Sequence, residues 1–209
     1  LSITQIGLSE SHNPRIINGR IIEESVFAET MRINMFFENG LRAACTASAV
    51  SDNTLITAAH CVKDGSSSLK NVKVISGEAT GAVSIEWRAQ PKYSTLSTSY
   101  DVALVVFPDD TFKTWYTVAD QPPAIGDKFI IIGYGKTNFN SSTIDHLKRY
   151  GSNTLTKVGQ RLNFLGSATT SATESATGQR VSNDVGDSGG PMILNDRLIG
   201  ISSSIGSSL

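Results

Sequence analysis

Short runs of hydrophobic residues, separated by clusters of Gly, Asn, Asp and Ser, recur along the whole chain. Some runs alternate hydrophobic and polar positions, as TMRINMFF does, and others are continuously apolar, as VALVVF is. Short runs of this kind, bounded by turn residues, are typical of β-strands rather than of helices. We therefore predict an all-β barrel or sandwich. Its strands are expected at residues 30–37, 44–51, 71–77, 82–87, 102–107, 128–135, 191–194 and 197–202, with a short helical turn at 58–63.

The chain is expected to divide into two halves near residue 120. The stretch DQPPAIGD at 120–127 contains two adjacent prolines and separates one group of predicted strands from the next. Prolines of this kind mark turns and strand ends. We predict an N-terminal unit at 16–119 and a C-terminal unit at 120–209, and an exposed loop in the Ser-, Thr- and Ala-rich stretch at 166–178.

Composition and charge exclude several classes of protein. The 209 residues include 18 Lys and Arg and 19 Asp and Glu, a net charge of −1. No basic surplus can neutralise phosphates, so we expect no nucleic-acid partner. No apolar run reaches the ~18 residues of a membrane helix, so we expect no membrane span. Two cysteines are too few for a four-thiolate zinc site, and no cofactor motif occurs. We expect no cofactor and no metal, while acidic loops leave calcium binding open.

The strongest chemical signal is the motif GDSGGP at residues 186–191. A serine flanked by glycines suits a tight turn that exposes a hydroxyl and points backbone N–H groups at one place, as a serine nucleophile requires. A glycine-rich turn without function explains the motif alone as well. An esterase of the α/β-hydrolase type would need a later histidine and a following helix. No histidine follows Ser188, and Pro191 interrupts a helix.

His60 is the candidate base for such a nucleophile. It lies in LITAAHC, where an apolar strand runs into small residues, whereas His12 and His146 lie in polar stretches typical of exposed surface. Asp101 precedes the apolar run VALVVF, and a carboxylate at the mouth of a buried strand needs a partner. Taken singly, a structural histidine and a turn-forming aspartate explain these residues as well.

Together, TAAHC, DVALV and GDSGGP, in the order His, Asp, Ser, resemble the chymotrypsin/trypsin family of serine proteases over most of the chain. The resemblance implies two antiparallel, six-stranded β-barrels. It also implies that the second barrel is truncated at its C-terminus, because family members continue with another strand and a terminal helix.

The same resemblance implies a role for each of these residues. His60 would be the general base, oriented by Asp101, and Ser188 the nucleophile. The N–H groups of Gly186 and Ser188 would form the oxyanion hole. The resemblance thus implies an endopeptidase that acts on protein or peptide substrates through an acyl-enzyme. The alternative is a catalytically silent, protease-like binding domain.

The two cysteines fit the resemblance. Cys45 and Cys61 are 16 residues apart, and Cys61 directly follows His60. The family commonly closes its histidine loop with a bridge at this place, which implies a Cys45–Cys61 disulfide and a secreted protein, extracellular or periplasmic. Two free thiols in a reducing cell are the alternative. A metal site made of these two cysteines and His60 lacks further ligands nearby.

The stretch Arg15-Ile16-Ile17-Asn18-Gly19 resembles the activation site of the family. There, an activating protease cuts after the basic residue, and the freed amine of Ile16 would insert beside Asp187 as an ion pair. Residues 1–15 would then be a propeptide and the chain a zymogen. Asn18 replaces the usual glycine, and asparagine tolerates a positive φ. Residues 1–15 lack the features of a signal peptide and begin with Leu, so we expect an upstream segment to have been removed or trimmed.

The resemblance also indicates residues that bind substrate. Ser182, six residues before the nucleophile, would lie at the base of the primary specificity pocket, and its neutral side chain favours apolar or aromatic residues before the scissile bond. An inward-pointing Asp184 would favour basic residues instead. Ser203, Ser204 and Gly206 resemble the strand that pairs with the substrate backbone by β-augmentation.

Overall fold

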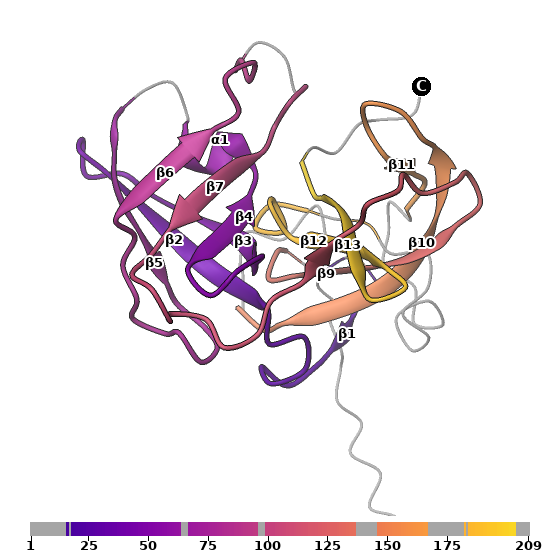
Figure 1. The fold of residues 1–209 in the computed structure, drawn as a ribbon, viewed down its shortest axis with the longest axis horizontal. Helices are drawn as coiled ribbons and strands as arrows, with labels where there is room; N and C mark the ends of the chain where they lie inside the picture. Colours follow the sequence, from indigo (N-terminus) through magenta and orange to yellow (C-terminus); the bar gives the residue numbers. More distant parts are fainter. Residues whose placement is uncertain are drawn as a thin grey trace, which may run out of the picture.

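The computed structural model describes residues 16, 18–63, 67–95, 99–136, 146–166, 182 and 184–203. Within these residues the chain is nearly all β, with one short helix, α1 (Ala59–Val62). The strands form two separate sheets, which lie side by side (Figure 1). One sheet comes from the N-terminal half of the chain, and the other comes mostly from the C-terminal half. The predicted all-β class is confirmed.

The first sheet is a six-stranded, antiparallel and nearly closed barrel, with the order β5-β2-β3-β4-β7-β6. Alternate residues of its second strand, from Met31 to Phe37, are buried because they point into the barrel. A bridge between Lys73 and Val83 brings β5 beside the segment that precedes β6 and so draws the two edges together. The strands are β2 (Thr30–Phe37), β3 (Arg42–Ala49), β4 (Thr54–Thr57), β5 (Leu69–Val74), β6 (Glu86–Ala89) and β7 (Ala103–Val106).

The second sheet has seven strands, in the order β1-β10-β9-β12-β13-β8, and β11 pairs with β10. In the described residues it is an open path rather than a closed barrel. Two of its strands, β1 and β8, come from the first 119 residues, and β8 lies parallel to β13. The domain boundary at residue 120 stays a prediction. The strands are β1 (Arg20–Ile21), β8 (Thr117–Val118), β9 (Lys128–Gly133), β10 (Arg149–Lys157), β11 (Asn163–Phe164), β12 (Pro191–Leu194) and β13 (Arg197–Ile201).

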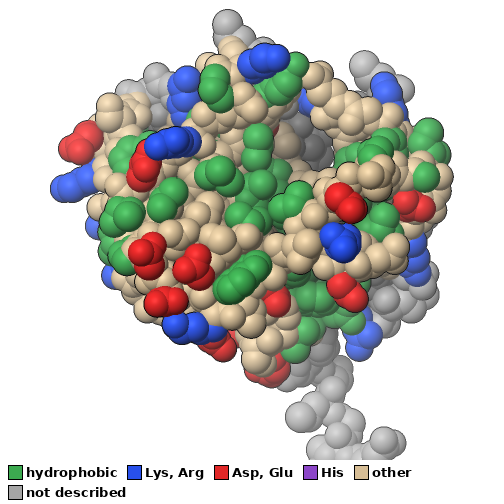
Figure 2. All heavy atoms as spheres, in the orientation of Figure 1, with side chains coloured by type: hydrophobic (Ala, Val, Ile, Leu, Met, Phe, Trp, Pro, Cys, Tyr) green, Lys and Arg blue, Asp and Glu red, His purple; other side chains and the backbone are tan. Residues whose placement is uncertain are grey.

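Each sheet has its own hydrophobic core. The larger cluster fills the first barrel and includes Ile33, Leu55 and Phe107, all fully buried. Two smaller clusters lie on the second sheet, one of them around Phe129 and Ile131. On the surface, acidic and basic side chains are interspersed over the face shown in Figure 2. No helix in the described ranges is long and apolar enough to cross a membrane.

Candidate active site

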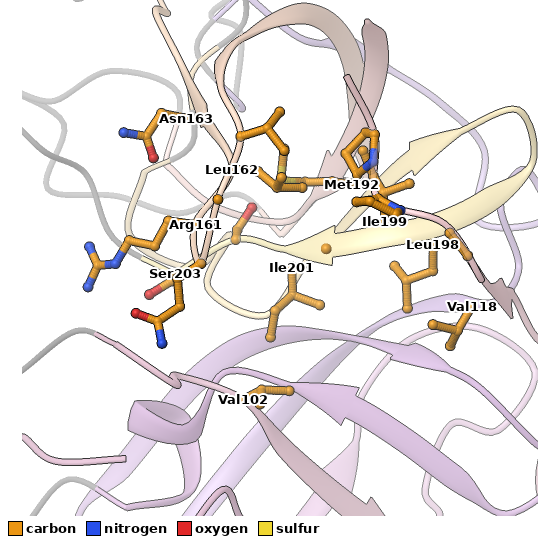
Figure 3. Close-up of a pocket in the computed structure, with 18 of the residues that line it drawn as sticks. Val102, Val118, Arg161, Leu162, Asn163, Met192, Leu198, Ile199, Ile201 and Ser203 are labelled. Carbon is orange, nitrogen blue, oxygen red and sulfur yellow. The ribbon is translucent and has the colours of Figure 1, made fainter. Parts of the chain in front are cut away.

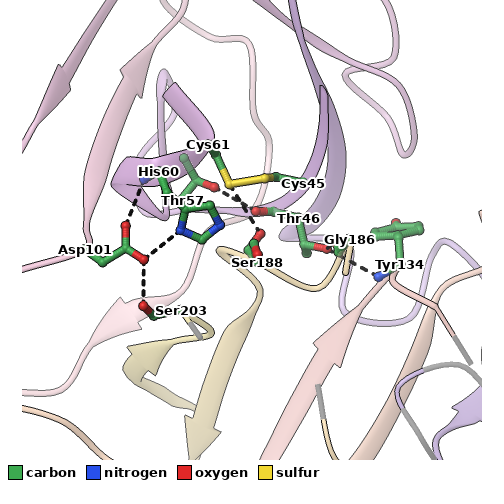
Figure 4. The surroundings of a disulfide bond; sticks show 10 residues. All are labelled: Cys45, Thr46, Thr57, His60, Cys61, Asp101, Tyr134, Gly186, Ser188 and Ser203. Carbon is green, nitrogen blue, oxygen red and sulfur yellow. Dashed lines mark hydrogen bonds and ion pairs between the residues drawn. A yellow bond between two sulfur atoms is a disulfide. The ribbon is translucent and has the colours of Figure 1, made fainter. Parts of the chain in front are cut away.

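The helix α1 and the segment that precedes β7 bring His60 and Asp101 together. Asp101 Oδ1 accepts a hydrogen bond from the backbone N–H of His60 at 2.8 Å, and Oδ2 accepts one from the ring Nδ1 at 2.7 Å (Figure 4). The Asp101 side chain is 4% exposed and that of His60 is 35% exposed. The buried carboxylate therefore fixes the orientation of the ring and the tautomer with its proton on Nδ1, which leaves Nε2 able to accept a proton.

Ser203, just beyond β13, donates a third hydrogen bond to this carboxylate, from its Oγ to Asp101 Oδ2 at 2.6 Å. Burial raises the pKa of Asp101, but the hydrogen bonds from His60 and Ser203 outweigh it, so the pKa is below its usual range. Asp101 is thus held as a carboxylate beside His60. This contact was not predicted from the sequence, in which Ser203 was expected only to contact substrate.

Ser188 lies in a segment that hydrogen-bonds both to β3 of the first sheet and to the residues that follow β13 of the second. Its carbonyl oxygen accepts a hydrogen bond from the Thr46 N–H of β3 at 2.9 Å, and Gly189 donates to the Ser202 carbonyl at 2.7 Å. The Sγ of Cys61 lies 3.9 Å from the same Ser188 oxygen. The structure therefore brings the predicted nucleophile, base and orienting carboxylate to one place from three distant parts of the chain.

Gly189 shows why this segment needs glycine. Its φ is +82°, in the left-handed region, and a Cβ there would lie 2.1 Å from Thr57 Oγ1 and 2.3 Å from the Thr46 carbonyl oxygen. Only a residue without a side chain lets the segment approach β3 and β4 so closely. The close approach places Ser188 beside the start of α1.

Among the described residues, the backbone amides of Gly186 and Ser188 have no hydrogen-bond acceptor. In the described part of the chain, neither N–H donates a hydrogen bond, although the Gly186 carbonyl is held by Thr46 Oγ1 at 2.8 Å. Two amides without acceptors, two residues apart, fit the requirement of an oxyanion hole. Across the same ranges, no hydrogen bond joins the Ser188 hydroxyl to the His60 ring.

The structure joins Cys45 of β3 to Cys61 of α1 in a disulfide. The two sulfur atoms lie within 4.8 Å of a ring nitrogen of His60. Because both sulfurs are used in the bridge, they are not thiolate ligands for a metal ion. The bridge instead fixes α1, which carries His60, to β3, whose Thr46 N–H donates a hydrogen bond to the Ser188 carbonyl oxygen.

Asp187 is fully buried directly before the candidate nucleophile. Its Oδ1 accepts from the Gly135 N–H at 2.7 Å and its Oδ2 from the Asp184 N–H at 2.9 Å. Burial raises its pKa to about 7, although these two hydrogen bonds and the positive charge of Arg149 oppose the rise. The hydrogen bonds and the charge of Arg149 therefore do not offset the burial of this carboxyl group.

The predicted activation residues lie only partly in the described chain. The Ile16 side chain is fully buried with Phe129, Ile131 and Leu155 of the second sheet. Asn18 is also buried and adopts a φ of +65°, in the left-handed region expected for it. Arg15 and the rest of the predicted propeptide lie outside the described residues.

A cleft of about 630 Å³ lies between the sheets, beside Asp101 and Ser203. Figure 3 shows Ile201 of β13 directed across it toward Val102. The predicted specificity residues Ser182 and Asp184 do not line this cleft. Asp184 is buried, and its Oδ1 accepts from the Val185 N–H at 2.6 Å. Ser204 and Gly206 lie outside the described residues, as does nearly all of the predicted loop at 166–178.

Comparison with known proteins supports a single family. A protein-family model described as Trypsin matches residues 21–208. Trypsin-3 of Homo sapiens is 27% identical over 167 residues, which cover 75% of this chain and 55% of that relative, so the match spans about half of the relative's length. Trypsin epsilon of Drosophila erecta is 27% identical over 211 residues, with 88% of this chain and 77% of that relative covered.

Solved structures show the same fold. HL collagenase matches with a TM-score of 0.67 and 21% identity, covering 91% of this chain and 86% of that chain. The scabies mite inactivated protease paralogue S-D1 matches with a TM-score of 0.69 and 17% identity, covering 92% of this chain and 88% of that chain. At these identities the likeness concerns the fold alone.

Proposed function

The chain belongs to the trypsin family of serine proteases, and from this premise we propose that it is a serine endopeptidase with Ser188 as nucleophile. The observation that carries the proposal is the 2.7 Å hydrogen bond from His60 Nδ1 to Asp101 Oδ2. It leaves Nε2 to take the proton from the Ser188 hydroxyl, and the Asp101 carboxylate stabilises the imidazolium that forms.

The acyl transfer follows from the remaining groups. The Ser188 oxygen attacks the scissile carbonyl, whose developing oxyanion is stabilised by the unpaired amides of Gly186 and Ser188. His60 then returns the proton to the leaving amine, and the amine departs. Water, activated by the same imidazole, hydrolyses the acyl-enzyme and restores the free serine.

We also propose that cleavage after Arg15 activates the protein. The freed Ile16 amine would add a positive charge beside buried Asp187, and Asp187 adjoins both Gly186 and Ser188. The raised pKa of Asp187 supports this role, because an ammonium partner favours the carboxylate. A protease with trypsin-like preference would make the cut, and residues 1–15 would be the propeptide.

Primary specificity is proposed to be for apolar or aromatic side chains. Ser182 offers no counter-ion for lysine or arginine. One observation favours the second candidate, a basic preference: Asp184 Oδ2 is buried without a hydrogen-bond partner in the described residues. Cleavage of a peptide library by the activated protein separates the two specificities.

The Cys45–Cys61 disulfide supports a secreted protein, extracellular or periplasmic.

A fluorophosphonate probe tests activity and activation together. We expect the probe to label Ser188 only after limited trypsin cleavage at Arg15, with the labelled residue located by mass spectrometry. Ser188→Ala, cleaved in the same way, is the control without a nucleophile. Labelling before cleavage would contradict the zymogen proposal.

The same experiment tests the silent binding domain. The missing hydrogen bond between the Ser188 hydroxyl and His60 is the observation that favours this second candidate. If the folded protein, with its cleavage at Arg15 verified, is not labelled, the protease proposal is overturned and the silent binding domain is favoured. Arg15→Gln, which trypsin cannot cut at this site, shows whether any labelling depends on this cleavage.

A further inference from the structure

A partly buried cluster of polar side chains lies at the junction of the two sheets, away from His60 and Ser188. At its centre is the hydroxyl of Tyr134, which follows β9. This hydroxyl donates to Glu24 Oε2 at 2.6 Å and accepts from Ser76 Oγ at 2.9 Å. Glu24 belongs to the segment between β1 and β2, and Ser76 follows β5. The Tyr134 hydroxyl thus joins both sheets.

Lys148 fixes the segment that supplies Glu24. Its ammonium group is buried and donates to the carbonyl oxygens of Glu24, Val26 and Phe27 at 2.8, 3.1 and 2.9 Å. Three carbonyls satisfy all three of its N–H groups. It also lies 3.8 Å from Glu24 Oε2 and 5.9 Å from the centre of the Tyr134 ring. The backbone from which Glu24 reaches Tyr134 is therefore held by Lys148.

The backbone of Tyr134 leads in the other direction, to the segment that contains Ser188. Its N–H donates to Thr46 Oγ1 at 3.3 Å, and that hydroxyl donates to the Gly186 carbonyl. On either side of Tyr134, a Cβ added to Gly133 or Gly135 would lie 2.2 or 2.5 Å from an atom of the Asp187 carboxyl group. A shift of Tyr134 would therefore be transmitted to Asp187 and Gly186.

We propose that Tyr134, anchored through its hydroxyl by Glu24 and Ser76, is a positioning residue for Asp187 and thereby for the amides of Gly186 and Ser188. This inference rests on the proposed function for its effect on catalysis. Its structural part, the control of residues 184–190 by a distant phenol, holds whether or not the protein is a protease.

Tyr134→Phe removes only the hydroxyl and keeps the ring in place. In the cleaved protein we expect kcat to fall roughly 10- to 100-fold with KM little changed, because small misplacements of groups that act in the transition state cost rate rather than binding. Glu24→Gln keeps an acceptor for the phenol and should lose less activity than Glu24→Ala.

Tyr116→Phe is the matched control. Tyr116 is also a buried tyrosine between the sheets, but its hydroxyl shares a 2.9 Å hydrogen bond with Thr30 Oγ1 and its N–H donates to the Ala49 carbonyl. Neither bond reaches residues 184–190 directly, although the two tyrosines share Thr30 as a neighbour, since the Tyr134 hydroxyl also lies 3.3 Å from the Thr30 carbonyl oxygen. We expect its kcat to stay within about twofold of the parent protein. An equal loss in both tyrosine variants would overturn the proposal, because it would indicate a general loss of stability.

Hydrogen exchange gives a readout that does not need activity. Tyr134→Phe should speed exchange in peptides that cover residues 133–136 and 184–190, while Tyr116→Phe should leave these peptides unchanged. Unchanged exchange there in Tyr134→Phe would overturn the proposal. If the parent protein is never labelled at Ser188 but these peptides respond to Tyr134→Phe, the protease proposal fails and the positioning inference stands.

Discussion

At the scale of single residues, two buried aspartates have opposite pKa shifts for reasons visible in their contacts. Burial raises the pKa of each carboxyl group. Asp101 overcomes burial because the ring of His60, the hydroxyl of Ser203 and a backbone N–H all donate to it. Asp187 accepts from two amides only, so its pKa stays raised to about 7. Asp101 is therefore held as a carboxylate, whereas Asp187 keeps its proton to a higher pH than usual.

The raised pKa of Asp187 predicts a pH-dependent cost to stability in the uncut protein. The folded protein keeps this proton up to about pH 7, whereas the unfolded chain releases it near the ordinary value of 3.8. Between these two values the folded state binds more protons, so the contribution of Asp187 to stability falls as pH rises. Compared with Asp187→Asn, the parent should lose stability from about pH 4 to 7 and change no further above pH 7.

Urea unfolding of both proteins across this range measures the effect. The other titrating groups are common to both proteins, and the substituted amide adds only an offset that does not vary with pH. A difference in unfolding free energy that is flat between pH 4 and 7 would contradict the raised pKa.

Residue roles differed in how far the sequence could predict them. His60, Asp101 and Ser188 were predicted because each lies in a local motif, and the structure brings them together. The hydrogen bond of Ser203 to Asp101 and the anchoring of Tyr134 were not predicted. Both join residues about 100 positions apart, and no local pattern reports such a pairing. The glycines on either side of Tyr134 were a local sign that another part of the chain packs closely there, and that part is Asp187.

At the scale of elements, strands were predicted where hydrophobic residues mark the buried face. β2 and β12 match their predicted ranges. β10, the longest strand, was missed because its buried positions include Arg149, Gly151 and Asn153 rather than large apolar residues. Polar buried residues remove the alternation on which strand prediction depends. The strand exists because both of its edges are paired, with β9 on one side and with β1 and β11 on the other.

The end of β9 allows an element-scale prediction. In Gly135→Ala the new Cβ would lie 2.5 Å from the Asp187 carboxyl carbon, so either the strand end or the Asp187 segment must move. We expect a loss of about 1–3 kcal/mol in unfolding free energy, as for other overpacked sites, and slower labelling of Ser188 in the cleaved protein.

Gly159→Ala is the control for this substitution. A Cβ at Gly159 meets no atom within 4 Å, and the residue lies outside the left-handed region. Its unfolding free energy should stay within about 0.5 kcal/mol of the parent. Equal stability of the two variants, measured by urea unfolding, would argue against tight packing around Asp187.

At the scale of the whole molecule, the two sheets are held together by the candidate site itself. Residues 184–190 hydrogen-bond to β3 of the first barrel and to the end of β9 in the second sheet. The family and the two-barrel plan were predicted from three short motifs. The truncation expected for the second barrel stays a prediction. The entry of β1 and β8 into that sheet was not predicted, because strands of two residues leave no periodic signal.

The disulfide gives a prediction at this scale. Cys45→Ala combined with Cys61→Ala removes a bridge that closes a loop of 16 residues. In the chain-entropy model such a loop contributes about 3 kcal/mol. We expect a fall of this size in unfolding free energy by urea denaturation under oxidising conditions. Under reducing conditions the parent protein should approach the variant, and a parent that stays more stable by the full amount would contradict the assignment to the bridge.

The order of the residues along the chain also imposes an order in time. His60 and Asp101 are synthesised in the first half of the molecule, but Gly189 is held by Ser202, and Asp101 by Ser203. A nascent chain that has completed only its first barrel therefore has the proposed base, His60, without the proposed nucleophile, and its Asp101 carboxylate lacks the hydrogen bond from Ser203. This arrangement of contacts can therefore assemble only after the chain has been synthesised as far as residue 203.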